Sequence, residues 1–190
     1  MSPSSSFERI TDAIESFNWR PEVQVEQIPA PQRISPYAYA IEATILATAD
    51  DEIGTGRLIV LHDPSGNQAW NGAHRCVSFA QADVDLEMVT DPLLAEVGWT
   101  WLTEALDTNG AGYHDASGTV TAVSSRSFGE LAGEADRAEI EIRASWTPEF
   151  NQTVDIMPHL AAWQSLLCMT AGLPPIADGI ISLTTRLEQQ

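Results

Sequence analysis

The chain has 190 residues, 44% of them hydrophobic, and a formal net charge of −18. This length and composition predict one domain over residues 1–190 with a sizeable core, and with flexible ends near residues 1–5 and 176–190. Because a strongly acidic chain repels phosphate groups, we expect that it binds neither nucleic acid nor an anionic membrane. All nine basic residues are arginine, which excludes sites that need a lysine amine, such as a P-loop, a pyridoxal Schiff base or the lysine-glutamate pair of a protein kinase.

Cysteine content and apolar runs predict the cellular location. The sequence shows no N-terminal signal-peptide pattern and no apolar run long enough to span a membrane. Its two cysteines, Cys76 and Cys168, lie far apart, which fits reduced and buried thiols better than a disulfide framework. We therefore expect a cytoplasmic protein.

The first half of the chain predicts a helix followed by four strands. Ser5 and Glu8 have the spacing of a capping box, and apolar residues then repeat along one face of a helix that ends near Asn18. Alternating or continuous apolar runs predict an antiparallel meander with strands near residues 22–28, 37–45, 57–62 and 74–81, and a turn at 50–56.

The second half predicts two more helices and two more strands. Asp91 is expected to be the N-cap of a helix that has Pro92 in its first position and ends at Gly110. Two strands near residues 119–127 and 138–146 and a final helix from about 155 to 171 follow. We therefore predict an α+β fold, with a mainly antiparallel sheet of five to six strands and three helices in the order α-β4-α-β2-α.

Two tryptophans in the middle helix, Trp99 and Trp101, are two positions apart and so point to nearly opposite sides. Apolar residues cover about two thirds of this helix, which is more than packing on a sheet alone requires. We expect Trp101 to face the sheet and Trp99 to face the final helix, which is apolar nearly all round.

The final helix has two interpretations. No charged residue lies between Asp155 and Asp178. The first interpretation is an inner helix packed against Trp99 and the sheet. The second is an interface with another subunit or protein, because aromatic residues and methionine without charge are typical of interface cores. The residues of that interface would be Trp99, Trp163, Leu167 and Met169.

A ligand site is predicted where two paired strands end. His62 ends one strand and His74 begins the next, so a hairpin brings them together. Trp70 lies among amide side chains in the connecting loop, where it either helps to hold a ligand or covers the sheet edge, and Arg143 completes the expected pocket. His74 and Cys76 share a strand face, but this mixed pair lacks the spacing of a metal site. We expect no metal and no cofactor.

No catalytic residue is predicted. His114 and Asp115 are adjacent, as in part of a hydrolase triad, but the GxSxG elbow is absent. A calcium loop starting at Asp83 is rejected because Met88 and Leu94 stand where such a loop needs glycine and glutamate.

Several phrases of the sequence, in order, resemble an actinobacterial family known as a domain of unknown function, DUF3000. These phrases are "RPEVQVEQIPAPQRISPYAYAI", "TGRLIVLHDPSGNQAWNG", "DPLLAEVGWTWLTEAL", "FGELAG", "EIRASWTP" and "LLCMTAGLPP". The resemblance implies an actinobacterial, cytoplasmic protein, and it carries no catalytic or binding residue. The predicted order of elements is also similar to that of small acidic secretion chaperones, which usually dimerise and hold a client chain on an apolar surface; this analogy concerns the fold alone.

The expected function is therefore a non-enzymatic protein-interaction or chaperone-like module that associates with itself or with a protein partner. The alternative is a protein that binds a small ligand, or an enzyme that needs no lysine, with its pocket near His62 and His74.

Overall fold

The computed structural model describes residues 3–150 and 153–175 of the chain. In chain order the elements are α1 (Pro3–Ser16), β1 (Val23–Ile28), β2 (Tyr37–Thr48), β3 (Asp51–Asn67), β4 (Gly72–Asp83), η1 (Met88–Thr90), α2 (Leu94–Thr108), β5 (Tyr113–Ser125), η2 (Gly129–Leu131), β6 (Arg137–Pro148) and α3 (Met157–Thr170). The predicted α+β class and the order α-β4-α-β2-α are confirmed. Of the expected flexible ends, residues 1–2 and 176–190 lie outside the described residues, whereas residues 3–5 belong to α1.

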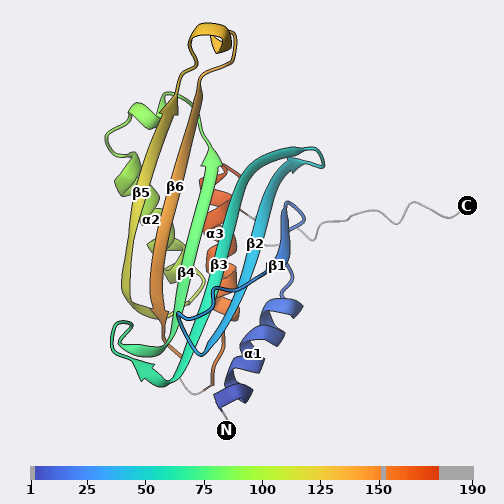
Figure 1. Cartoon of the computed structure of the whole chain (residues 1–190), viewed down its shortest axis with the longest axis vertical. Helices are drawn as coiled ribbons and strands as arrows, with labels where there is room; N and C mark the ends of the chain where they lie inside the picture. The colour runs from blue at the N-terminus through green and yellow to red at the C-terminus, as the bar shows by residue number, and fades with distance from the viewer. Residues whose placement is uncertain (1–2, 151–152, 176–190) are drawn as a thin grey trace, which may run out of the picture.

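The six strands form one antiparallel sheet in the order β1-β2-β3-β4-β6-β5 (Figure 1). β1 to β4 form the predicted meander, because each strand pairs with the next one along the chain. After α2 the chain returns as a β5–β6 hairpin, in which β6 pairs with β4 and β5 lies outside it. β1 and β5 are consequently the two edges of the sheet.

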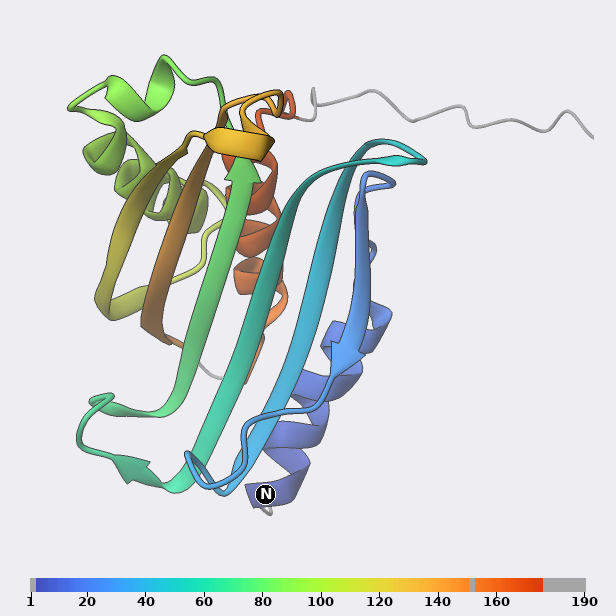
Figure 2. The ribbon, with the colours of Figure 1, turned by 45° about the horizontal axis from the view of Figure 1, so that its top comes forward.

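The three α-helices of the described residues lie on one face of the sheet, and no helix in this part of the chain covers the other face (Figure 2). We call these the helix face and the open face. On the helix face, apolar side chains from alternate strand positions pack against apolar stripes of the helices. In α1 this stripe is Phe7, Ile10 and Ile14, which are at most 8% exposed.

α3 is an inner helix. Trp163 and Leu167 are at most 1% exposed, although no charged residue on α3 marks a solvent side. Gly56 of β3 lies directly under this helix, where an added Cβ would collide with Leu167 and lie 3.1 Å from the ring of Trp163. The first interpretation of the uncharged helix, a core element, therefore describes its position.

β3 is longer than predicted, because the expected turn over residues 50–56 is wrong. The turn occupies residues 49–50, and the strand begins at Asp51. The glycines that indicated a turn serve close packing instead: a Cβ at Gly54 would lie 2.8 Å from the carbonyl oxygen of Gln81. β5 likewise begins at Tyr113, earlier than the expected residue 119.

The predicted orientation of the two α2 tryptophans is also wrong. Trp99 packs on the sheet, where a Cβ at Gly118 of β5 would lie 2.9 Å from its ring. Trp101 lines a surface cavity together with Met169 of α3. The physical reason is Gly98, which has no side chain and so lets α2 approach β5 and β6 closely. A pattern of apolar side chains does not include this glycine among the residues that face the sheet.

The helix starts differ slightly from expectation. α2 begins at Leu94, after a turn in which the carboxylate of Asp91 accepts a hydrogen bond from the backbone N–H of Leu93 at 2.9 Å. Asp155 makes the same kind of bond to the backbone N–H of Met157 before α3, at 3.0 Å. Among the described helices, none is both long enough and apolar enough to cross a membrane.

Candidate functional site

The candidate site is a hollow of about 660 Å³ on the open face, which spans β3, β4, β6 and β5. We call it the open-face hollow. Its floor is apolar, two arginines flank it and hydroxyl groups complete it. These residues are Ile59, Val77 and Phe79 on the floor, Arg57 and Arg143 on the flanks, and the hydroxyl residues Ser117, Thr119 and Ser145.

Strand register brings these distant residues together. Side chains alternate between the faces along a strand, so residues directly opposite each other on neighbouring strands share a face. One row across four strands consists of Arg57, Phe79, Arg143 and Thr119. The adjacent row consists of Ile59, Val77, Ser145 and Ser117.

The two flanking arginines are half-exposed and paired, yet they keep free donors. Nη1 of Arg143 lies 2.6 Å from a carboxylate oxygen of Glu141, and its guanidinium carbon lies 5.2 Å from the centre of the Phe79 ring. Nη2 of Arg57 donates to Glu42 at 2.7 Å. A guanidinium has five N–H donors, so each arginine retains donors beyond its ion pair.

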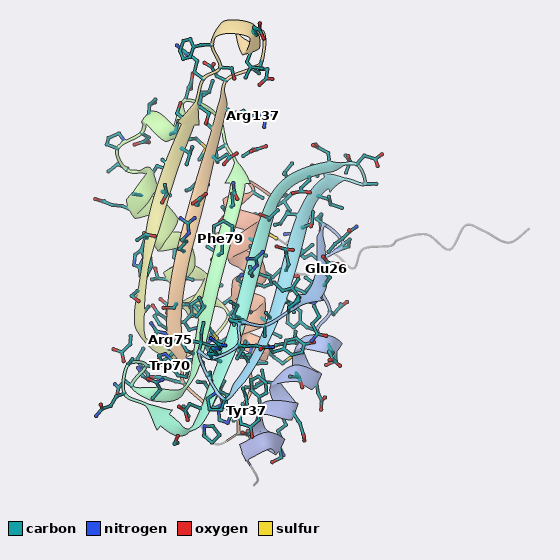
Figure 3. The ribbon with its side chains drawn as sticks, viewed as in Figure 1. Glu26, Tyr37, Trp70, Arg75, Phe79 and Arg137 are labelled. Atoms are coloured by element: carbon teal, nitrogen blue, oxygen red, sulfur yellow. The ribbon has the colours of Figure 1, made fainter. Side chains whose placement is uncertain are left out.

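A third arginine, Arg75, lies buried at one end of the open face, on the same strand as Phe79 (Figure 3). Only 8% of it is exposed. Its Nη1 donates to the carbonyl oxygen of Asp115 and to Oγ1 of Thr147, both at 2.9 Å. Its Nη2 donates to Oγ of Ser145 at 2.7 Å, and to Oγ of Ser117 at 3.4 Å. Burial lowers the pKa of Arg75, and the charge of Asp115 opposes this shift.

The two histidines of the predicted ligand pocket meet, but on the helix face. His62 and His74 are opposite each other in register, and their rings stack with centroids 4.3 Å apart. Phe7 stacks on His62 and Phe150 meets His74 edge-on, so rings fill the surroundings of the pair. Burial, and secondarily the charge of His62, lower the pKa of His74 to about 4. Both rings form a packed cluster that holds an uncharged His74 at neutral pH.

The structure does not bring Trp70 and Arg143 to these histidines. Trp70 lies in the β3–β4 turn, near Arg75 in Figure 3, and its carbonyl oxygen accepts a hydrogen bond from Thr147 at 2.5 Å. Cys76 is on the same face of β4 as His74, and it lies opposite Trp146 of β6, so Trp146 is on that face too. Arg143 is three positions from Trp146 on the same strand, and an odd separation places it on the other face. Arg143 therefore points to the open face, and the expected four-residue pocket is not formed.

The four predicted interface residues differ in how far they are exposed. Trp163 and Leu167 are covered by the chain itself, being 0% and 1% exposed. Trp99 and Met169 are half-buried beside the core. A partner therefore has no access to Trp163 or Leu167 in this fold, which corrects the expectation that these two form an interface.

The described residues show no activated nucleophile among the thiols. Cys76 and Cys168 are both buried and free, and burial raises the pKa of Cys76 to about 12. Burial also raises the pKa of Cys168. In the described ranges, no group of three or more histidine, cysteine, aspartate or glutamate residues is arranged to hold a metal ion.

Sequence reasoning missed Arg57, Arg75 and Phe79. The run of residues 57–62 is apolar at most positions, which draws attention away from Arg57 at its start. The available signal was strand alternation, which places Arg75 and Phe79 on one face of the same strand. Which residues of other strands join them depends on register, which alternation alone does not determine.

Comparisons with known proteins give a family and nothing further. Searches of curated proteins and of solved structures found no match. The family described as "Protein of unknown function (DUF3000)" matches residues 3–181, which is nearly the whole chain, and the chain therefore belongs to the DUF3000 family.

Proposed function

We propose that this DUF3000 protein is a non-enzymatic interaction module that binds an extended segment of a partner protein across the open face of its sheet. The observation that carries this proposal is the sidedness of the fold. All three α-helices lie on one face, and the open-face hollow on the other has an apolar floor of Ile59, Val77 and Phe79. Holding a client segment in this way is a chaperone-like role.

The shape and lining of the hollow support an extended peptide as occupant. The hollow spans four antiparallel strands and two rows of side chains rather than closing into a deep cavity, so a ligand lying on it touches several strands. Apolar surface bordered by polar groups is typical of protein-binding surfaces. Arginine and aromatic residues, here Arg143 stacked on Phe79, are the residue types that contribute most to such binding.

The state of the reactive side chains supports a non-enzymatic role. The two thiols are buried with raised pKa values, and His159 is 1% exposed. The net charge of −18 supports a protein partner rather than nucleic acid, because phosphate backbones are repelled. Two buried free cysteines also support a reducing, cytoplasmic location.

Site-specific photo-crosslinking in cells tests the proposal. A photoreactive phenylalanine analogue replaces Thr119 in the hollow or, as control, the exposed Glu96 on α2. We expect a discrete crosslinked protein from position 119 and none from position 96. The partner, identified by mass spectrometry and purified, should bind the wild type and bind Phe79→Asp at least about tenfold more weakly.

The matched control is Thr121→Asp, which adds the same charge to the open face outside the hollow. Circular dichroism confirms that both variants fold. Equal loss of binding by Phe79→Asp and Thr121→Asp, or crosslinking only from position 96, contradicts the proposal.

A further inference from the structure

Arg75 is a buried cation without a carboxylate partner. In the part of the chain that the structure describes, its hydrogen bonds go to two backbone carbonyls and three side-chain hydroxyls, and it forms no ion pair. The carboxylate of Asp115 makes its ion pair with Nδ1 of His114 at 2.9 Å, and its charge acts on Arg75 without an ion pair, opposing the lowering of the Arg75 pKa by burial. This is unusual in a chain of net charge −18, since buried charges are normally paired.

Two hydroxyls connect this cation to the open-face hollow. Oγ of Ser145 and Oγ of Ser117 accept hydrogen bonds from Nη2 of Arg75, and both serines line the hollow. Each oxygen accepts from the guanidinium, and the two hydroxyls also hydrogen-bond to each other, with either one as donor, so at least one hydroxyl proton remains for a further acceptor. The two oxygens are 3.5 Å apart, so an acceptor that bonds to one hydroxyl lies close to the other and can compete for its proton.

The charge of the hollow specifies what that acceptor is. Arg57 and Arg143 are each balanced by one carboxylate, from Glu42 and Glu141. The charge of Arg75 is thus the one that is not balanced by an ion pair among the charged residues at the hollow. A single negative charge complements it, whereas a dianion meets repulsion from Glu42, Glu141 and the acidic chain as a whole.

We infer that the end of the open-face hollow formed by Ser117 and Ser145, next to Arg75, binds a carboxylate of the partner segment. We call this end of the hollow the carboxylate seat. The inference rests on the proposed function, which it makes more specific. The neighbouring apolar floor then holds an apolar side chain of the same segment against Phe79 and Val77. The carboxylate comes either from an acidic side chain or from the C-terminus of the partner, and both present the same two oxygens to the hydroxyl donors.

Peptide titrations monitored by the backbone amide signals of the full chain test this inference. Three hexapeptides of Thr and Val are compared: one with a central Phe-Glu and both ends capped, its Phe-Gln counterpart, and the Phe-Gln peptide with a free C-terminus. We expect the capped Phe-Glu peptide to bind about tenfold more tightly than the capped Phe-Gln peptide, as for one charge-assisted hydrogen bond. Shifts should centre on β4, β5 and β6. Tight binding of the third peptide instead identifies a C-terminal carboxylate as the source and equally supports the seat.

Two pairs of matched variants locate the seat. The double variant Ser117→Ala, Ser145→Ala should remove most of the preference for the carboxylate, while Ser125→Ala, a serine on the same face of β5 outside the hollow, should keep it. Arg143→Gln should weaken binding, while Arg137→Gln, on the same face of β6 but outside the hollow, should not.

The outcomes separate the two proposals. If all three peptides bind the hollow equally, the carboxylate seat is overturned and the open face remains a peptide-binding surface. If inorganic phosphate shifts Ser117 and Ser145 at lower concentration than acetate does, the seat is for a different anion and the inference also fails. If none of the peptides shifts signals on the open face, both the inference and the proposed function are rejected.

Discussion

The indole Nε1–H of Trp146 on β6 donates a hydrogen bond to Nδ1 of His159 on α3, at 3.1 Å. Trp146 is 0% exposed and His159 is 1% exposed, so the bond lies inside the core between the sheet and its inner helix. The acceptor role requires Nδ1 to be unprotonated. Burial lowers the pKa of His159 to about 4, although the charge of Asp155 opposes this shift.

This pair predicts a loss of stability on acidification. An unfolded histidine has a pKa near 6.5 and so takes up its proton at higher pH than folded His159 or His74. Their contribution to the free energy of unfolding is therefore complete above pH 6.5, falls between pH 6.5 and about 4, and is fully lost below that. For His159 the loss is about 3 kcal/mol.

Urea denaturation at pH 7.5, 6.5, 5.5 and 4.5 measures this dependence. His159→Gln is the comparison, because its amide oxygen can still accept from Trp146 but does not titrate. The wild type should lose its advantage over the variant as the pH falls. Stability curves that stay parallel over this range count against a titrating His159.

We expect substitution of Leu167 to lower the stability of the fold and to leave self-association unchanged. Leu167→Ala removes a side chain that is 1% exposed and should lower the free energy of unfolding by about 2–5 kcal/mol. Met169→Ala, at a half-buried position of the same helix, should cost less. Sedimentation of the two variants should give the same mass as the wild type. A change of mass with unchanged stability in Leu167→Ala is the contrary result.

Two strand glycines lie directly under helix side chains, and we expect that replacing either one by alanine lowers the free energy of unfolding. A Cβ at Gly56 would collide with Leu167, and a Cβ at Gly118 would collide with the carbonyl oxygen of Arg143 and crowd Trp99. Each alanine variant should lose about 1–3 kcal/mol, and Gly118→Ala should lose more because backbone must move. Gly133→Ala is the control, since no atom lies within 4 Å of its added Cβ. Thermal unfolding that ranks Gly133→Ala with the other two refutes this packing.

We expect the two buried thiols to be protected from chemical modification in the native protein. Burial raises the pKa of Cys76 to about 12, and both cysteines are at most 4% exposed. Native protein should therefore react negligibly with a disulfide reagent at pH 8, and two thiols should react in urea. Rapid labelling of Cys76 in the native protein is incompatible with its placement on the helix face.

The sequence by itself determined the class of fold and the order of its elements, and it predicted that α3 avoids water without deciding between core and interface. Period-two and helical patterns identify strands and helices because they reflect which side of each element avoids water. An uncharged run such as residues 156–177 indicates a dry environment for the same reason.

The tertiary structure decided which residues meet. Register joined Arg57, Phe79 and Arg143 in one row and placed Arg143 on the opposite face from His74, because a shift of one residue reverses every side chain of a strand. Gly98 decided which tryptophan of α2 faces the sheet. These outcomes depend on contacts between segments far apart in the chain, and a pattern within one segment carries no information about its neighbour across the sheet.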